Sequence, residues 1–252
     1  AIAAEHKELV YYREHGNKVV KRSDVLQMIT ESSFNICIAG THGKTTITTM
    51  IAHLLRDSGF GCNAFLGGIA ANYNTNLWGS EKNVCVIEAD EYDRSFLKLY
   101  PDVAIITAMD ADHLDIYGTA EKMEQAFIDF SRQVKPGGLV IGKFGLKRSA
   151  ELKTENYWTY SLQNESADVY AKNIRTVNGN YDFDVMVKDE LIKDIRLSMG
   201  GMHNIENVVA AITVASFLKI GNDEIKKAGQ NFKGGKRRFE YILPPSAKPG
   251  EG

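Results

Sequence analysis

A short loop rich in glycine and threonine, residues 40–46 (GTHGKTT), lies between an apolar run and a stretch with helical periodicity. Backbone N–H groups in such a loop, together with the positive end of the following helix, can bind phosphate. Lys44 is placed to neutralise the β and γ phosphates of a nucleotide, and Thr45 to offer its hydroxyl to magnesium. The residues expected to bind the nucleotide here are Gly40, Thr41, His42, Gly43, Lys44, Thr45 and Thr46.

This loop departs from the general phosphate-binding pattern G-x-x-x-x-G-K-[ST], because the first glycine of that pattern would fall at Ile38. The alternative interpretation is a tight turn between a strand and a helix that carries a lysine without binding an anion. The order of apolar run, glycine loop and helical stretch favours the phosphate site.

Two acidic segments, residues 88–93 (EADEYD) and 110–115 (DADHLD), each follow an apolar run. Because parallel sheets bind ligands at the carboxyl ends of their strands, we expect both segments near the phosphate loop. Clustered carboxylates attract a cation, and magnesium prefers carboxylates, waters and phosphate oxygens. His113 could ligate a metal as neutral imidazole or contact the transferred phosphate. The alternatives are a solvated acidic loop and a structural histidine.

Asn204 and Asn207 lie at the start of a predicted helix, three residues apart and therefore on one face. They could hold a nucleotide base or orient a loop, and the alternative is capping of the helix by an asparagine. A basic run further along the chain could form a solvated face or contact phosphate. It consists of Lys233, Lys236, Arg237 and Arg238.

The elements that must position these residues follow from the hydrophobic pattern. Continuous apolar runs predict parallel strands buried on both faces, at residues 35–39, 84–87, 103–107 and 139–141. Helical signals occur at residues 44–56, 120–134, 202–218 and 223–228. Residues 157–197 alternate as in antiparallel strands, and residues 18–20 are strand-like. We therefore expect an α/β fold: a mostly parallel sheet with flanking helices and a small antiparallel side sheet.

Composition places further bounds on function. Charged residues make up 25% of the chain and the formal net charge is −2, so no overall field favours nucleic acid or a membrane as partner. The longest uncharged apolar stretch, residues 208–218, is far shorter than the roughly 20 residues of a membrane span. Cys37, Cys62 and Cys85 lie in apolar stretches without metal-type spacing and predict reduced core residues, which favours the cytoplasm.

Five motifs together resemble the Mur ligases, and among them the alanine-adding branch. In chain order they are GTHGKTT at Gly40, EADEYD at Glu88, DADHLD at Asp110, HNIEN at His203 and KRRF at Lys236. Their order and spacing cover residues 36–239. His42 resembles the alanine-adding branch, and no counterpart of the carbamylated lysine found in other branches follows His113.

This resemblance implies an ATP- and Mg²⁺-dependent ligase of peptidoglycan precursor synthesis. The γ-phosphate of ATP would pass to the lactyl carboxylate of UDP-N-acetylmuramate, and the amine of L-alanine would then displace phosphate. The catalytic residues implied are Lys44, Glu88 and His113. The magnesium ligands implied are Thr45, Glu88 and His113. Asn204 and Asn207 are expected to approach adenine, and Arg238 the phosphates.

In the same family an N-terminal domain holds the UDP group and a C-terminal domain closes over the ATP. We therefore expect residues 1–30 to be the tail of the first domain with its linker, 31–235 the central ATP-binding domain, and 236–252 a linker to a missing third domain. The absence of an initiator methionine also predicts a piece of a longer protein. Segments 67–76 and 93–96 are expected to face the sugar substrate.

Several alternatives remain open at this point. A ligase that recycles murein tripeptide and a folylpolyglutamate synthase-like ligase would share the ATP-binding core. From other classes, the chain could be an isolated nucleotide-binding module without turnover, or a kinase-like phosphotransferase.

Overall fold

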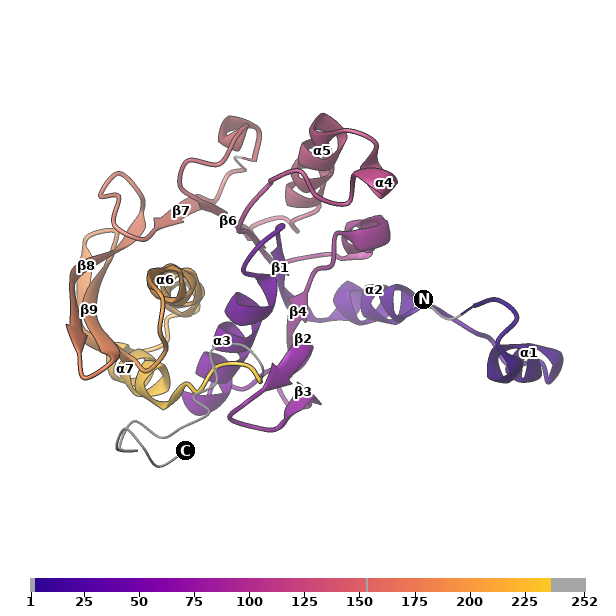
Figure 1. The fold of residues 1–252 in the computed structure, drawn as a ribbon, viewed down its shortest axis with the longest axis horizontal. Helices are drawn as coiled ribbons and strands as arrows, with labels where there is room; N and C mark the ends of the chain where they lie inside the picture. Colours follow the sequence, from indigo (N-terminus) through magenta and orange to yellow (C-terminus); the bar gives the residue numbers. More distant parts are fainter. Residues whose placement is uncertain (1–2, 153, 237–252) are drawn as a thin grey trace, which may run out of the picture.

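The computed structural model describes residues 3–152 and 154–236 of the 252-residue chain. Within them, one mixed sheet has the strand order β10-β9-β8-β7-β6-β5-β1-β4-β2-β3 (Figure 1). The first five strands along the chain are β1 Phe34–Ala39, β2 Asn63–Ala70, β3 Thr75–Trp78, β4 Val84–Glu88 and β5 Val103–Ile106. The remaining strands are β6 Leu139–Lys143, β7 Tyr157–Ser161, β8 Val169–Val177, β9 Asn180–Val187 and β10 Glu190–Leu197.

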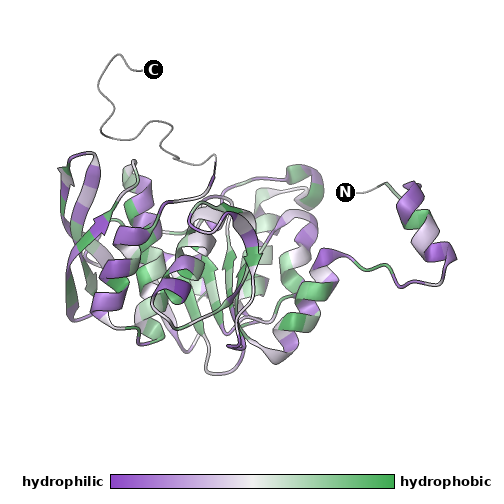
Figure 2. Cartoon of the chain, turned by 90° about the horizontal axis from the view of Figure 1, so that it is seen from below, coloured by the Kyte–Doolittle hydropathy of each residue, from purple (hydrophilic) through white to green (hydrophobic). Residues whose placement is uncertain are grey.

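Helices cover both faces of the central strands. The α-helices are α1 Lys7–Glu14, α2 Arg22–Ser32, α3 Lys44–Asp57, α4 Leu114–Tyr117, α5 Ala120–Ser131, α6 Met202–Phe217 and α7 Asn222–Asn231. The 3₁₀ helices within the described ranges are η1 Tyr92–Lys98 and η2 Ser149–Leu152. Strands β8 and β9 curve around α6, while α1 lies apart from the body (Figures 1 and 2).

Strand β1 explains how the two layers of helices are held. Ile36 and Ile38 join the apolar cluster that includes α3 and α6, whereas Cys37 and Ala39 join the cluster that includes α5. All four side chains are fully buried. Residues 36–39 are apolar on both faces of the strand, so both faces must be covered, which is the arrangement of a parallel α/β sheet. Figure 2 shows the hydrophobic residues concentrated in these central strands.

The predicted fold class is confirmed: β4, β1, β5, β6 and β7 pair in parallel, and β8, β9 and β10 are antiparallel. The antiparallel strands continue the main sheet, because β8 pairs in parallel with β7. The strand-like assignment of residues 18–20 is wrong, since they form no strand and Val19 and Val20 are exposed. Strands β2 and β3 were not foreseen, because their glycines and asparagines weaken the apolar pattern.

The three cysteines are buried and free, as expected from their apolar surroundings. Burial raises the pKa of the Cys62 thiol to about 12 and that of Cys85 above its ordinary value. These thiols therefore serve as small apolar core groups. No helix in the described part of the chain is long and apolar enough to cross a membrane.

His53 of α3 links this helix to α7 and to the turn between β2 and β3. Its ring is 2% exposed, with Nε2 2.9 Å from the carbonyl oxygen of Ala228 on α7 and Nδ1 2.8 Å from the hydroxyl of Tyr73. Burial lowers the pKa of His53 from its ordinary value of 6.5. The folded state therefore favours the neutral ring.

A histidine with a lowered folded-state pKa binds fewer protons in the folded than in the unfolded state. Its stabilising contribution is present above pH 6.5 and is lost as the pH falls from there through the folded-state pKa. We expect the free energy of unfolding to fall as the pH falls below 6.5, and to fall less steeply in His53→Gln. Urea unfolding across that range measures both slopes. Identical slopes would contradict this assignment.

Candidate nucleotide and cation site

The phosphate loop joins the end of β1 to the start of α3. Gly40 and Gly43 have φ values of 132° and 81°, and Gly43 is the N-cap of α3. The helical hydrogen bonds begin with Ile47 N–H, which donates to the Gly43 carbonyl at 2.9 Å. The N–H groups just before Ile47 therefore form the positive end of the helix. This geometry is suited to an anion and supports the predicted phosphate site.

Close packing against the end of β5 fixes this loop. A side chain at Gly40 would overlap the hydroxyl and backbone of Thr107. The same hydroxyl lies within hydrogen-bonding distance of the Ala39 and His42 carbonyl oxygens. His42 itself is exposed, with Nε2 3.7 Å from a carboxylate oxygen of Asp110. The second acidic segment therefore borders the loop, as the parallel-sheet argument predicted.

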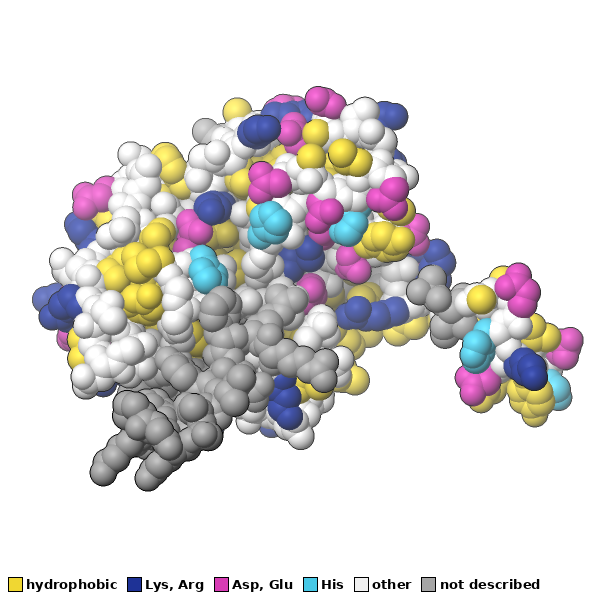
Figure 3. All heavy atoms as spheres, viewed as in Figure 1, with side chains coloured by type: hydrophobic (Ala, Val, Ile, Leu, Met, Phe, Trp, Pro, Cys, Tyr) yellow, Lys and Arg dark blue, Asp and Glu magenta, His cyan; other side chains and the backbone are white. Residues whose placement is uncertain are grey.

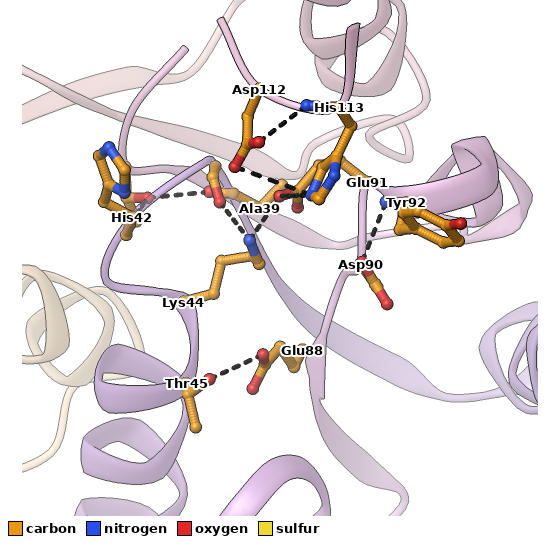
Figure 4. Close-up of polar contacts among 12 residues, drawn as sticks. Ala39, His42, Lys44, Thr45, Glu88, Asp90, Glu91, Tyr92, Asp112 and His113 are labelled. Carbon is orange, nitrogen blue, oxygen red and sulfur yellow. Dashed lines mark hydrogen bonds and ion pairs between the residues drawn. The ribbon is translucent and has the colours of Figure 1, made fainter. Parts of the chain in front are cut away.

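Lys44 forms a buried ion pair with Glu91 (Figure 4). Its ammonium donates to Glu91 Oε1 and to the Gly40 carbonyl, both at 2.6 Å. The side chains of Lys44 and Glu91 are 15% and 2% exposed. Two of the three N–H donors of the lysine are thus occupied, and the third is left for another acceptor. Tyr117 holds the same segment by donating its hydroxyl to the Glu91 backbone carbonyl at 2.6 Å.

Thr45 and Glu88 form the second contact across the loop. The Thr45 hydroxyl donates to Glu88 Oε1 at 2.8 Å, from the first turn of α3 to the end of β4 (Figure 4). Because the hydroxyl gives its hydrogen to the carboxylate, the lone pairs of its oxygen remain available to a cation. A hydroxyl and a carboxylate are oxygen ligands of the kind that magnesium prefers.

His113 approaches the same Glu91 oxygen that accepts the hydrogen bond from Lys44. Its Nε2 is 4.0 Å from Glu91 Oε1 and 3.8 Å from Asp112 Oδ2, and its ring packs edge-on against Tyr92. Within residues 3–152 and 154–236, no hydrogen bond or ion pair joins His113 to Glu88 or Thr45. Nor do three His, Cys, Asp or Glu side chains there converge as a metal-binding group. Thr45, Glu88 and His113 as magnesium ligands stay a prediction.

The two asparagines of α6 meet the other side of the loop. Asn204 is buried and donates from Nδ2 to the Gly200 carbonyl at 2.6 Å, while Asn207 donates to Asn204 Oδ1 at 3.3 Å. Asn207 Oδ1 would lie 3.2 Å from a Cβ placed on Gly43. The N-cap of α6 is Gly201, so the alternative of capping by an asparagine is wrong.

Two buried polar atoms beside the loop have no partner among the described residues: Thr41 Oγ1 and Glu91 Oε2. Buried polar groups are ordinarily hydrogen-bonded, because leaving one unpaired costs roughly 1–3 kcal/mol. A hydroxyl suits a phosphate oxygen, and a carboxylate oxygen suits a cation or water. The site therefore fits a phosphate with an accompanying cation.

Figure 3 shows histidine and acidic side chains gathered over the ends of the central strands. The structure brings together the predicted loop residues, Glu88, Asn204 and Asn207, and Thr46 is half-buried in the first turn of α3. Arg237 and Arg238 lie outside the described residues. Sequence reasoning placed Glu91 in an acidic segment without singling it out, and it missed Thr107 and Tyr117 entirely. No local signal marks these two, because their hydrogen-bond partners lie 26 to 68 residues away in the sequence.

A glycine loop between a parallel strand and a helix, with carboxylates after the neighbouring strand, defines a nucleotide-binding α/β domain. Residues 38–215 match the family model described as the Mur ligase middle domain. The chain therefore belongs to the Mur ligase family.

Curated relatives include two enzymes named UDP-N-acetylmuramate–L-alanine ligase. The one from Parabacteroides distasonis is 46% identical over 96% of this chain, and the one from Flavobacterium johnsoniae is 44% identical over 96%. The chain covers 53% and 52% of these relatives and so spans about half their length.

Solved structures agree on the fold. UDP-N-acetylmuramate-alanine ligase from Thermotoga maritima superposes with a TM-score of 0.80 and 25% identity, covering 96% of this chain and 55% of that one. A UDP-N-acetylmuramate:L-alanyl-gamma-D-glutamyl-meso-diaminopimelate ligase from Neisseria meningitides gives 0.79 at 22% identity, covering 94% and 78%. The latter likeness shows the fold alone.

The Lys44–Glu91 pair makes a prediction about stability. Removing one partner of a buried ion pair leaves the other charge uncompensated, which costs roughly 3–5 kcal/mol. We expect Lys44→Met to destabilise the nucleotide-free protein by about that amount, and Lys44→Met/Glu91→Gln to recover much of the loss. Urea unfolding measures both.

Lys21→Met is the matched control, because Lys21 and Asp93 form an ion pair at 3.0 Å with both side chains largely exposed. Exposed pairs contribute little, so this variant is expected to unfold like the parent chain. A double variant as unstable as Lys44→Met would show that the buried carboxylate is not the cause.

Proposed function

We propose that this chain is the ATP- and Mg²⁺-binding middle part of a ligase that joins L-alanine to UDP-N-acetylmuramate in peptidoglycan precursor synthesis. The observation that carries the proposal is the loop of residues 40–46. Its helix N-terminus, the Lys44 ammonium and the unpartnered Thr41 hydroxyl all suit phosphate. The names of the relatives at 42–46% identity supply the substrates.

The reaction proceeds in two displacements. The substrate carboxylate attacks the γ-phosphorus of ATP, and the bond to the β-phosphate oxygen breaks, giving an acyl phosphate and ADP. The amine of L-alanine then attacks the acyl carbon, inorganic phosphate leaves, and the amine loses a proton to give the amide. Catalysis of phosphoryl transfer depends on positioning and on neutralising phosphate charge.

The chain's own residues divide these tasks. Glu91 and the Gly40 carbonyl orient the Lys44 ammonium so that its remaining N–H faces phosphate. Thr45 and Glu88 would hold magnesium, with His113 a further ligand, and the bound ion would supply positive charge against the phosphates. Lys44, Glu88 and His113 are the proposed catalytic residues.

The nucleotide's other end and the domain limits complete the proposal. Asn207, which borders Gly43, and Asn204, which accepts a hydrogen bond from it, would approach adenine, and Arg238 the phosphates. We divide the chain into residues 1–30, 31–235 and 236–252, with ATP bound by the second part. Leu26 of α2 is buried against that part, whereas α1 has no buried residue.

The cytoplasm, where these soluble precursors would be joined, is the proposed location.

Calorimetric titration with ATP, with and without magnesium, tests the cation site. Thr45→Val keeps the shape of the side chain but removes the hydroxyl, and we expect magnesium-dependent binding to weaken at least about tenfold, as loss of a metal-site group typically causes. Lys44→Ala should lose most binding under both conditions, because the phosphates lose their cation.

Thr49→Val is the matched control, since the Thr49 hydroxyl only donates to the Thr45 carbonyl within α3. It should bind as the parent chain does. Equal binding by the Thr45 and Thr49 variants would refute the cation site. Phosphate release by the full-length enzyme with L-alanine, compared with murein tripeptide or folate as the second substrate, decides between the ligase classes.

A further inference from the structure

The hydrogen-bond ladder of the sheet is interrupted on both sides of β2 at the same place. Toward β4 the parallel pairing ends at Phe65, opposite Ile87. Toward β3 the antiparallel pairing shifts register between Phe65 and Ala70. Gly67 and Gly68 lie inside this gap. Their backbone groups are therefore free to bond to something other than a neighbouring strand.

Gly67 uses this freedom to hold a side chain of the cation site. Its backbone N–H donates to Glu88 Oε2 at 2.9 Å, while the Thr45 hydroxyl donates to Glu88 Oε1 at 2.8 Å. Each carboxylate oxygen thus accepts one hydrogen bond and keeps its remaining lone pair. The carboxylate is clamped between β2 and α3 and remains able to bind a cation.

The absence of a side chain at Gly67 is required by space. A Cβ there would lie 2.5 Å from both Glu88 carboxylate oxygens and 2.6 Å from Cδ. Carbon and oxygen atoms do not approach so closely without a bond, so any other residue would push the carboxylate away. The φ of Gly67 is not in the left-handed region, so backbone strain is not the reason for glycine here.

Strand β2 is fixed beyond the gap as well as before it. Lys236 N–H donates to the Ile69 carbonyl at 2.9 Å, and Ala71 N–H donates to the Gly234 carbonyl at 2.9 Å. Gly67 is therefore held between two anchored stretches of chain. A backbone amide on an anchored strand can fix the orientation of a carboxylate. Groups that hydrogen-bond to a metal ligand in this way affect the affinity for the metal.

We propose that Gly67 is a positioning residue for the cation site: its N–H orients the Glu88 carboxylate, and its missing side chain leaves the carboxylate room. This inference rests on the proposed function, in which Glu88 binds magnesium beside the nucleotide. It assigns to β2 a role in cation affinity that is separate from any contact between this strand and a substrate.

The test compares Gly67→Ala with Gly79→Ala. Gly79 lies just after β3, and a Cβ there would meet only Asn63 Oδ1, at an ordinary 3.6 Å. Calorimetry measures ATP binding at a series of magnesium concentrations and also without magnesium, and thermal unfolding checks each variant. We expect Gly67→Ala to need roughly 10- to 100-fold more magnesium, the usual effect of disturbing a group that orients a metal ligand. Magnesium-free ATP binding should stay unchanged, and Gly79→Ala should match the parent chain.

The double variant Gly67→Ala/Glu88→Asp adds a steric test. Aspartate is shorter by one methylene and leaves room for the new Cβ, so the magnesium requirement should rise less than the sum of the two single changes. If Gly67→Ala alone does not fold, recovery of folding in the double variant supports the assigned clash, and failure to recover overturns it.

The outcomes separate the two ideas. A parent chain that binds ATP with magnesium, with Gly67→Ala behaving as Gly79→Ala does, overturns the role of Gly67 and leaves the proposed function standing. A parent chain whose ATP binding ignores magnesium overturns the cation site and the role of Gly67 with it. Equal losses with and without magnesium in Gly67→Ala also overturn the inference, because they indicate general damage to the loop.

Discussion

Parallel pairing of β4, β1 and β5 is the constraint on which the candidate site depends. Phe34 to Ile38 pair with Val84 to Glu88, and Ile36 to Ala39 pair with Val103 to Ile106. Because the three strands run in one direction in this register, the loop after β1 and the acidic segments after β4 and β5 emerge at one edge. Apolar helices on both faces keep that edge fixed, so polar groups separated by some seventy residues meet without a local signal of their own.

Charge compensation then shapes the inside of this edge. Glu91 is almost fully buried and Lys44 nearly so, and burial of either alone would carry a large desolvation penalty. Their contact at 2.6 Å offsets that penalty only in part, since Glu91 Oε2 has no partner among the described residues. The site therefore contains the Lys44 ammonium, held by two acceptors, and the Glu91 Oε2 atom, which has no partner among the described residues. Such incomplete satisfaction in a native fold is typical of a place built to receive a ligand.

The antiparallel end of the sheet has a different task. Strands β8 and β9 curve around α6 (Figure 1), and α6 packs between them and α3. This arrangement brings the N-terminal part of α6 against the phosphate loop, where Asn207 in its second turn meets Gly43. Gly43, the N-cap of α3, has a positive φ of 81°. The approach of α6 to the N-terminus of α3 is thus permitted by a residue without a side chain on the α3 side of the contact.

The sequence by itself determined the local part of this protein. Uninterrupted apolar runs required doubly covered strands, and the loop ahead of Lys44 required a helix N-terminus open to an anion, because hydrophobic period and glycine placement act over a few residues. It did not reveal β2 and β3, the pairing of Glu91 with Lys44, or the hold of Gly67 on Glu88. These depend on strand order and register, which bring together residues from separate strands and loops. Only the tertiary structure decided them, since burial and hydrogen-bond partners over such separations are properties of the packed sheet and not of any segment.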